Sequence, residues 1–260
     1  MTDRVPDLPE EVRKELWGLH SAASELMAAQ IKRRRTIRAR WKADAREILD
    51  AHNLAFGVVS TLVTRKSGVP GKTSPSVDGR LAISASFIQG IEICEVAISE
   101  GLYVQAAAML KQELEAIAAL EEHRENRRKD QKTPNVGNTS FKWMKEVYRD
   151  LNAAAHIGNR DVLSSLVARQ LSEEITGAFI YPIYNREIAF YLYGLQVLLL
   201  ILLASEIDEL YKEMYNEELT AAEYRTLTVA GEILLEAGWL EASQAARPEQ
   251  QAAGAASSAK

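Results

Sequence analysis

Arg149 and His156, seven positions apart, are the side chains of this sequence best suited to chemistry on a phosphate group. Arginine stays charged at every physiological pH and can bind a phosphate through two parallel hydrogen bonds. Histidine can accept or donate a proton near neutral pH, and the negative end of a helix dipole favours its protonated form. Together the two groups supply what metal-free cleavage of a phosphodiester bond requires.

The residues around this pair predict a helix with one apolar and one polar face. At about 100° per residue, the apolar side chains share one face: Met144, Val147, Leu151, Ala154 and Ala155. Arg149, Asn152 and His156 share the opposite face, where Arg149 and His156 lie about 10 Å apart along the axis. That spacing allows both side chains to reach one ligand. The alternative interpretation is a surface arginine and a histidine that only caps the helix.

The segment Arg149-x6-His156, with the polar Asp150 directly after the arginine, resembles the Rx4-6H motif of the HEPN superfamily. The resemblance covers roughly residues 81–204. It implies an all-helical, metal-independent ribonuclease of the toxin or antiphage-defence type, in which two copies of the chain bring their motifs together. Arg149 would then stabilise the charged phosphorane, His156 would act as general base or acid, and Asp150 would orient one of them. The implied partners are RNA, a second copy of the chain and a partner protein of such a system. The alternative function is a non-catalytic helical interaction or scaffold protein that assembles through its long helices.

Five basic residues of the first predicted helix are candidates for contacts with nucleic-acid phosphates: Lys32, Arg33, Arg34, Arg35 and Arg38. A basic helix can bind phosphates without reading the base sequence. The alternative is a solvated face of long side chains, which names no ligand. The net charge of -5 argues against nucleic-acid binding by the protein as a whole.

Other kinds of catalytic or metal site are not indicated, and we expect neither a metal nor a cofactor. No histidine follows a glutamate by three positions, which excludes the Glu-x-x-His motif of ferritin-like bundles. The glycines form no GxGxxG or GxSxG. Cys94 is a single cysteine and has no partner for a disulfide or a CxxC pair. His52 continues the apolar stripe of Trp41 and Ile48, so we interpret it as a core or boundary histidine.

Composition predicts an all-α protein. Hydrophobic residues make up 47% and charged residues 26% of 260 residues, which suits one globular core. The 14 glycines and 7 prolines cluster and leave long uninterrupted stretches. We therefore expect a bundle of about six helices. A cytoplasmic location is expected, because the sequence starts without a basic segment followed by an apolar run.

The N-terminal part predicts one long helix. Apolar residues recur at three- and four-residue steps from Leu16 to about Lys66, where turn-forming residues interrupt the pattern. We accordingly divide the chain into three parts: a long basic N-terminal helix with a loop over 1–78, a helical bundle over 79–241 and a disordered tail over 242–260.

Within the bundle the patterns predict several further helices. A stripe from Leu81 to Ile98 ends at Gly101 and continues into a second helix, which gives an antiparallel hairpin. Further helices are expected over 139–156 and 185–215, and the sequence Thr-Ala-Ala-Glu starting at Thr220 is a capping box for the last one.

The apolar run from Ile188 to Ala204 needs a separate interpretation. Its 17 residues are at the lower limit of what spans a bilayer. Acidic residues follow it and no second spanning segment is expected, so we interpret it as a helix buried in the core. Membrane insertion and a contact between copies of the chain remain the alternatives.

Overall fold

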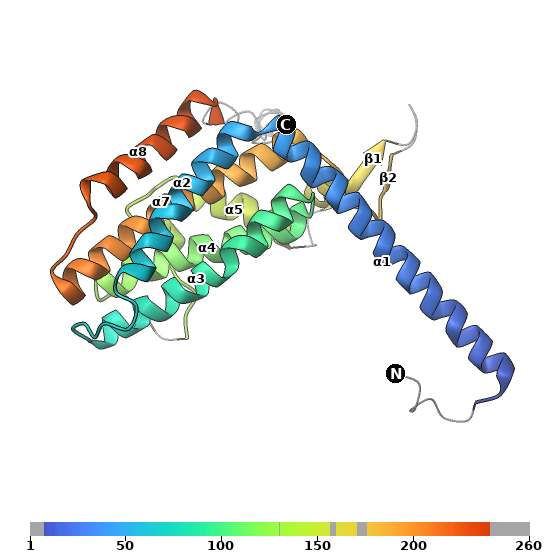
Figure 1. Cartoon of the computed structure of the whole chain (residues 1–260), viewed down its shortest axis with the longest axis horizontal. Helices are drawn as coiled ribbons and strands as arrows, with labels where there is room; N and C mark the ends of the chain where they lie inside the picture. Colours follow the sequence, from blue (N-terminus) through green and yellow to red (C-terminus); the bar gives the residue numbers. More distant parts are fainter. Residues whose placement is uncertain (1–7, 130, 157–159, 171–175, 240–260) are drawn as a thin grey trace, which may run out of the picture.

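The structure, a computed structural model, is an all-α helical bundle from which one long helix projects (Figure 1). It describes residues 8–129, 131–156, 160–170 and 176–239. In chain order the helices are α1 Glu10–Asp44, α2 Arg46–Arg65, α3 Pro75–Ser99, α4 Tyr103–Arg124, a 3-10 turn Val136–Asn138, α5 Met144–Ala155, α6 Arg160–Val167, α7 Arg186–Tyr215 and α8 Ala221–Glu236. The predicted fold class is confirmed. One antiparallel hairpin, β1 Ala168–Gln170 with β2 Thr176–Ala178, was not predicted.

Helix α7 forms the centre of the bundle and packs against α2, α3, α4 and α8. Asn185 caps its start by accepting a hydrogen bond from the Ile188 backbone N–H at 3.1 Å. Leu195, Leu199 and Leu203 have no exposed surface. Of the most apolar 18-residue stretch of α7, 67% is buried within the bundle. Most of the apolar side chains of this helix are therefore covered by the rest of the protein.

A second helix besides α7 is long and apolar enough to cross a membrane. The expectation that the chain has no second such segment was therefore wrong. This second helix is α3, whose most apolar window has a mean hydropathy of 1.6 and is only 33% buried. The open face of α3 carries small residues together with Leu81 and Ile93. The apolar surface of α3 is therefore divided between the core and the outside of the bundle.

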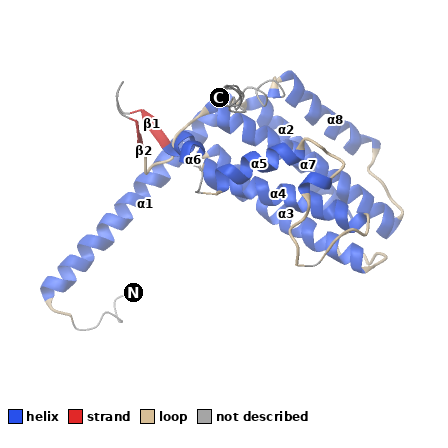
Figure 2. Ribbon diagram, turned by 180° about the vertical axis from the view of Figure 1, so that it is seen from behind, coloured by secondary structure: helices blue, strands red, loops and turns tan. Residues whose placement is uncertain are grey.

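The long N-terminal helix is interrupted, contrary to the sequence prediction. Ala45, at φ -137° and ψ 36°, separates α1 from α2. Trp41 and Ile48, on either side of the break, are both buried, and the ring centres of Trp41 and Tyr193 lie 5.2 Å apart. α2 then runs back along α7 and α8, while α1 leaves the bundle (Figure 2).

The predicted division at residue 78 is accordingly not a boundary in the packing. The α2 side chains Ala51, Ala55, Val59 and Leu62 have no exposed surface and share one core with α7 and α8. The N-terminal part of α1 projects from the bundle (Figure 1), and we call residues 10–31 of this helix the arm. The tail predicted over 242–260 lies outside the described residues.

The predicted hairpin of α3 and α4 is confirmed, with Gly101 at the turn. Its φ of +78° is a left-handed value that suits glycine, and a Cβ there would lie 2.4 Å from the Ile183 carbonyl oxygen. α3 starts at Pro75, earlier than predicted, because Ser74 accepts a hydrogen bond from the Val77 N–H. The capping box at Thr220 is present as predicted.

Candidate functional site

Helix α5 carries the predicted phosphate-cleaving residues on its outer side. The α5 side chains that enter the core are Met144, Val147 and Leu151. The Arg149 side chain is 69% exposed, and its Nε lies 3.3 Å from Asp150 Oδ1. His156 is exposed directly after the helix, where its backbone N–H donates to the Asn152 carbonyl at 3.0 Å. Asn152 itself is half-buried.

A cluster that sequence reasoning missed fastens α5 to α4 next to this pair. Tyr148 donates a hydrogen bond to Glu115 Oε1 at 2.6 Å, and the Lys111 ammonium lies 5.5 Å from the centre of the Tyr148 ring. Burial, with the hydrogen bond to Glu115, raises the pKa of Tyr148 to about 12. The phenol therefore stays protonated at neutral pH, and the cluster positions α5 instead of supplying a base. The i,i+4 spacing of Lys111 and Glu115 was its sequence signal.

The arrangement on α5 has a cation and an imidazole on an open surface. Arg149 can receive a phosphate there in exchange for its contact with Asp150. A general acid or base works best where water is excluded, and one copy of α5 supplies a single wall. The pair thus offers the chemical groups for phosphodiester cleavage on an exposed surface.

The basic residues of α1 are divided between the joint with the bundle and the open surface. Arg38 Nη2 donates to Glu95 Oε2 at 2.8 Å, and Arg34 Nε lies 3.4 Å from Glu100 Oε2. Arg33 Nε donates to the Pro182 carbonyl at 3.2 Å. Lys32 and Arg35 are exposed. Three of the five predicted nucleic-acid-binding residues are thus used to hold the base of α1 against α3 and the segment after β2.

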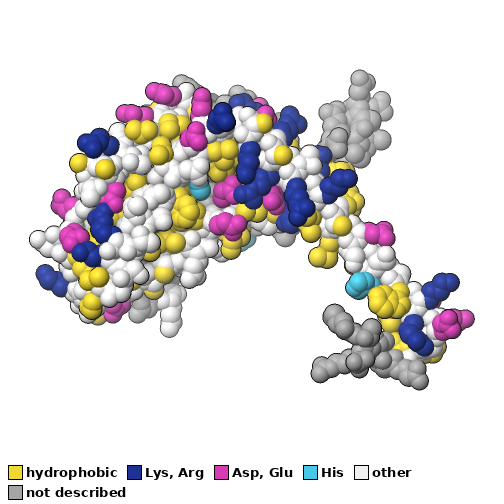
Figure 3. Space-filling view, viewed as in Figure 1, with side chains coloured by type: hydrophobic (Ala, Val, Ile, Leu, Met, Phe, Trp, Pro, Cys, Tyr) yellow, Lys and Arg dark blue, Asp and Glu magenta, His cyan; other side chains and the backbone are white. Residues whose placement is uncertain are grey.

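Glu95 is the most buried partner in this joint. Burial raises the pKa of its carboxyl, and the Arg38 guanidinium opposes that shift. Tyr193 also donates to Glu95, at 3.4 Å. In Figure 3 the Lys and Arg side chains gather where the arm meets the bundle, with acidic side chains beside them. This mixture of charges fits an internal fastening better than a uniformly positive surface for a polyanion.

The arm presents an apolar stripe that the described chain leaves uncovered. Every residue from Glu10 to Ala28 is exposed. The large apolar side chains of the stripe range from 36% exposed at Ile31 to 70% at Leu19: Val12, Leu16, Trp17, Leu19, Leu26, Met27 and Ile31. Figure 3 shows hydrophobic side chains along the projecting helix. The predicted helix is present at these residues, and their apolar side chains lie outside the bundle.

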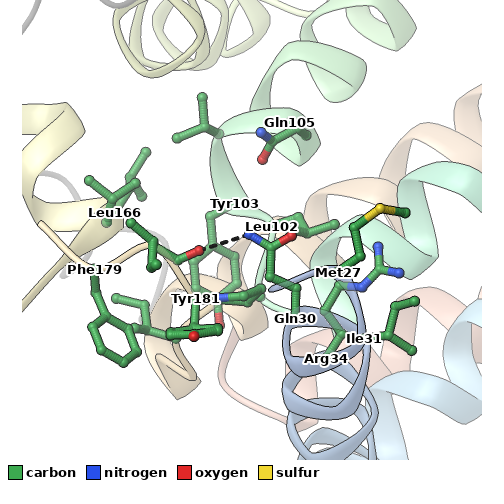
Figure 4. Close-up of a pocket in the computed structure, with 16 residues that line it drawn as sticks. Met27, Gln30, Ile31, Arg34, Leu102, Tyr103, Gln105, Leu166, Phe179 and Tyr181 are labelled. Carbon is green, nitrogen blue, oxygen red and sulfur yellow. Dashed lines mark hydrogen bonds between the residues drawn. The ribbon is translucent and has the colours of Figure 1, made fainter. Parts of the chain in front are cut away.

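A cavity of about 620 Å³ lies at the base of the arm (Figure 4). Its α1 wall consists of Met27, Gln30, Ile31 and Arg34, and the facing walls come from residues 101–105, 166–167 and 179–183. Gln30 spans one side by donating to the Ile180 carbonyl at 3.1 Å. The lining is mostly aliphatic and aromatic, so it suits an apolar occupant. Neither Arg149 nor His156 lines this cavity.

Among the described residues no group of three or more His, Cys, Asp or Glu side chains is placed to hold a metal ion. Comparison with known proteins adds no relative: no family model, no curated protein and no solved structure matches the chain. The arm and the exposed residues of α5 are therefore the features from which a function can be proposed.

Proposed function

We propose that the protein is a helical interaction protein that assembles with copies of itself through α1. The observation that carries this proposal is the uncovered apolar stripe on the arm, of which Leu19 is 70% exposed. Contiguous exposed apolar patches of this kind mark interaction surfaces in folded proteins. This was the alternative to the nuclease in the sequence analysis, and the geometry of the arm favours it.

The energetics of the arm support association. Burying one large aliphatic side chain contributes roughly 1.5–3 kcal/mol relative to leaving it exposed, and the stripe offers several of them. A helix without tertiary contacts is only marginally stable in water, because its stability in proteins comes mainly from packing of its apolar face. The exposed half of α1 has no such packing against the described part of the chain. A partner on the stripe would therefore both stabilise the helix and bury its apolar surface.

The test is the molar mass in solution by light scattering over a range of protein concentrations. Wild type is expected to form an assembly heavier than the 28.9 kDa chain. The double variant Leu16→Glu/Leu19→Glu places two charges on the stripe and is expected to be monomeric. The matched control Ser21→Glu/Ala28→Glu places two charges on the opposite side of the same helix and keeps the assembly. A wild-type protein that is monomeric at every concentration overturns the proposal.

The second candidate function is a HEPN-like metal-independent ribonuclease of the toxin or defence type. One observation favours it: Arg149 on α5, whose guanidinium contacts Asp150, and His156 directly after α5 are both exposed. Arg149 would stabilise the negative charge of the phosphorane, and His156 would transfer the proton.

The nuclease is tested by incubating RNA with the protein in the presence of a chelator. Cleavage is expected in wild type and in the control Lys145→Ala, which changes another exposed cation of α5. Arg149→Ala and His156→Ala are expected to lose cleavage while keeping the helical circular dichroism of wild type. Absence of cleavage by wild type, or cleavage that survives both substitutions, rules this function out.

A further inference from the structure

We propose that the partner of the arm is a second copy of this chain, bound antiparallel, so that the tip of each arm occupies the cavity at the base of the other. This inference rests on the proposed function and specifies its partner. It follows from three independent features of α1: the spacing of its apolar residues, the position of the cavity and the distribution of charge.

The apolar residues of the arm have the spacing of a two-helix seam. Steps of four and three alternate through Val12, Leu16, Leu19, Ala23, Leu26 and Gln30. This 4-3 alternation is the a/d repeat by which two helices pack side by side with their side chains interdigitated. Extended by two further steps, the same series reaches Ile37, which the bundle buries. The stripe is thus the continuation, beyond the edge of the bundle, of the side of α1 that already packs on it.

The cavity lies where this seam meets the bundle. Met27, Gln30 and Ile31 belong both to the end of the arm and to the cavity wall. A helix packed along the stripe must therefore end at the cavity, and the side chains at that end face its apolar lining. Figure 4 shows Gln30, Ile31 and Arg34 on one wall facing Leu102 and Tyr181 on the others.

Charge selects the antiparallel direction. A parallel pair would place the four consecutive cations 32–35 of one α1 helix beside the same four of the other, which is unfavourable. In an antiparallel pair centred at position 21, Val12 faces Gln30 of the second copy, Leu16 faces its Leu26, and Leu19 faces its Ala23. Glu11 then lies near Lys32 of the second copy, so opposite charges meet. The two bundles lie at opposite ends of the pair and do not collide.

This arrangement is closed by its two-fold symmetry. Each tip, with Val12 and Leu16, enters the cavity of the other chain, and no stripe or cavity remains for a third copy. One contact between the two copies thus covers the apolar stripe of the arm and fills the cavity at its base. Large and small side chains alternate across the seam at Leu19 and Ala23, which lets the two helices approach closely.

Disulfide cross-linking tests the direction. Val12 and Gln30 are separated by about 27 Å along one helix, so a disulfide between cysteines at these positions has to join two chains. The double variant Val12→Cys/Gln30→Cys is expected to form a covalent dimer under mild oxidation, whereas Val12→Cys and Gln30→Cys alone are not. The native Cys94 is buried and burial raises the pKa of its thiol, so it does not compete.

The outcomes separate this inference from the proposed function. Cross-linking of the single variants indicates a parallel pair, and a dimeric mass without cross-linking of the double variant indicates another register; each overturns the antiparallel arrangement while leaving association through α1 intact. A monomeric wild type in light scattering instead removes the proposed function itself.

Seating of the tip in the cavity has its own test. Ile180, 66% exposed, lines the cavity, and Leu235 on α8 is comparably exposed at 56%. Ile180→Glu places a carboxylate where the partner tip has to enter and is expected to raise the dimer Kd ten-fold or more. Leu235→Glu, the matched control, is expected to leave the Kd unchanged. Equal Kd values for the two variants show that the tip lies elsewhere.

Discussion

Arg38 of α1 donates a hydrogen bond to Glu95 of α3 at 2.8 Å, and the same guanidinium reaches Glu100 at 3.6 Å. One side chain thus links α1 to the end of α3, next to the point where α1 leaves the bundle. Together with Arg34, it sets the direction in which the arm projects. The basic run of the sequence is therefore largely a structural joint.

Replacing Arg38 by Met is expected to destabilise the fold, because it leaves Glu95 buried without its cation. The loss of a charged hydrogen bond costs about 1–3 kcal/mol, and the lower end applies because Arg38 is 31% exposed. Urea unfolding measures the change. The double variant Arg38→Met/Glu95→Gln is expected to recover part of the loss, and Arg35→Met, which changes an exposed cation, to change stability little. Equal losses for Arg35→Met and Arg38→Met contradict the joint.

Glu113 is expected to make the protein less stable as the pH rises. Burial raises the pKa of its carboxyl to about 8 from 4.5, against a smaller opposite effect of the neighbouring Cys94 thiol. Between these values the unfolded chain releases the proton and the folded chain keeps it, so the free energy of unfolding falls from pH 4.5 to pH 8. Each pKa unit corresponds to about 1.4 kcal/mol.

The measurement is urea unfolding of Glu113→Gln at several pH values between 5 and 8.5. This variant is expected to lack the part of the fall that belongs to Glu113 and to be more stable than wild type at pH 8.5. Glu92→Gln, at an exposed position of α3, is the control and keeps the wild-type slope. An unchanged slope in Glu113→Gln shows that the carboxyl is not protonated in the fold.

His52 is expected to make the protein less stable as the pH falls into the acid range. It is buried, its Nε2 has no hydrogen-bond partner among the described residues, and burial lowers its pKa to about 4 from 6.5. Between pH 6.5 and pH 4 the unfolded chain takes up a proton that the folded chain does not, so stability falls as the pH falls. His52→Gln should flatten this fall in acid unfolding curves. The exposed His20→Gln should reproduce the wild-type curve, and a flattening in both variants would count against His52 as the cause.

Two substitutions of glycine by alanine are expected to change the free energy of unfolding in opposite directions. Gly101→Ala forces an alanine into a left-handed conformation and against the Ile183 carbonyl, so it should lower the free energy of unfolding by more than about 1 kcal/mol. Gly57→Ala lies within α2 with no atom within 4 Å of the new Cβ and should raise it by about 0.5–1 kcal/mol. Thermal unfolding of both variants measures the difference, and a stabilising Gly101→Ala would show that the turn relaxes.

Local signals accounted for much of the fold. The capping box at Thr220, the glycine turn at Gly101 and the two faces of α5 each depend on residues within a few positions of one another, so the sequence displays them. His52 was correctly assigned to the core from its place on the Trp41 stripe.

The features that could not be predicted from the sequence depend on contacts between residues far apart along the chain. The break at Ala45 has neither glycine nor proline to mark it, and the buried residues Trp41 and Ile48 have the spacing of one continuous helix. Arg38 and Glu95 are 57 positions apart, so the basic run gave no sign of its ion pairs. The cavity combines four separate segments. The apolar stripe of the arm was visible in the sequence, but a helical period cannot tell which chain will cover it.

The length of α1 has a mechanical consequence. The base of the helix is held by Arg33, Arg34 and Arg38, while Leu16 lies about 32 Å beyond Ile37 at 1.5 Å per residue. The length of the helix therefore sets the distance between the bundle and a molecule that binds the tip of the arm. Removing seven residues would shorten that reach by about 10 Å and return the stripe to nearly the same side, so spacing and recognition can be varied separately.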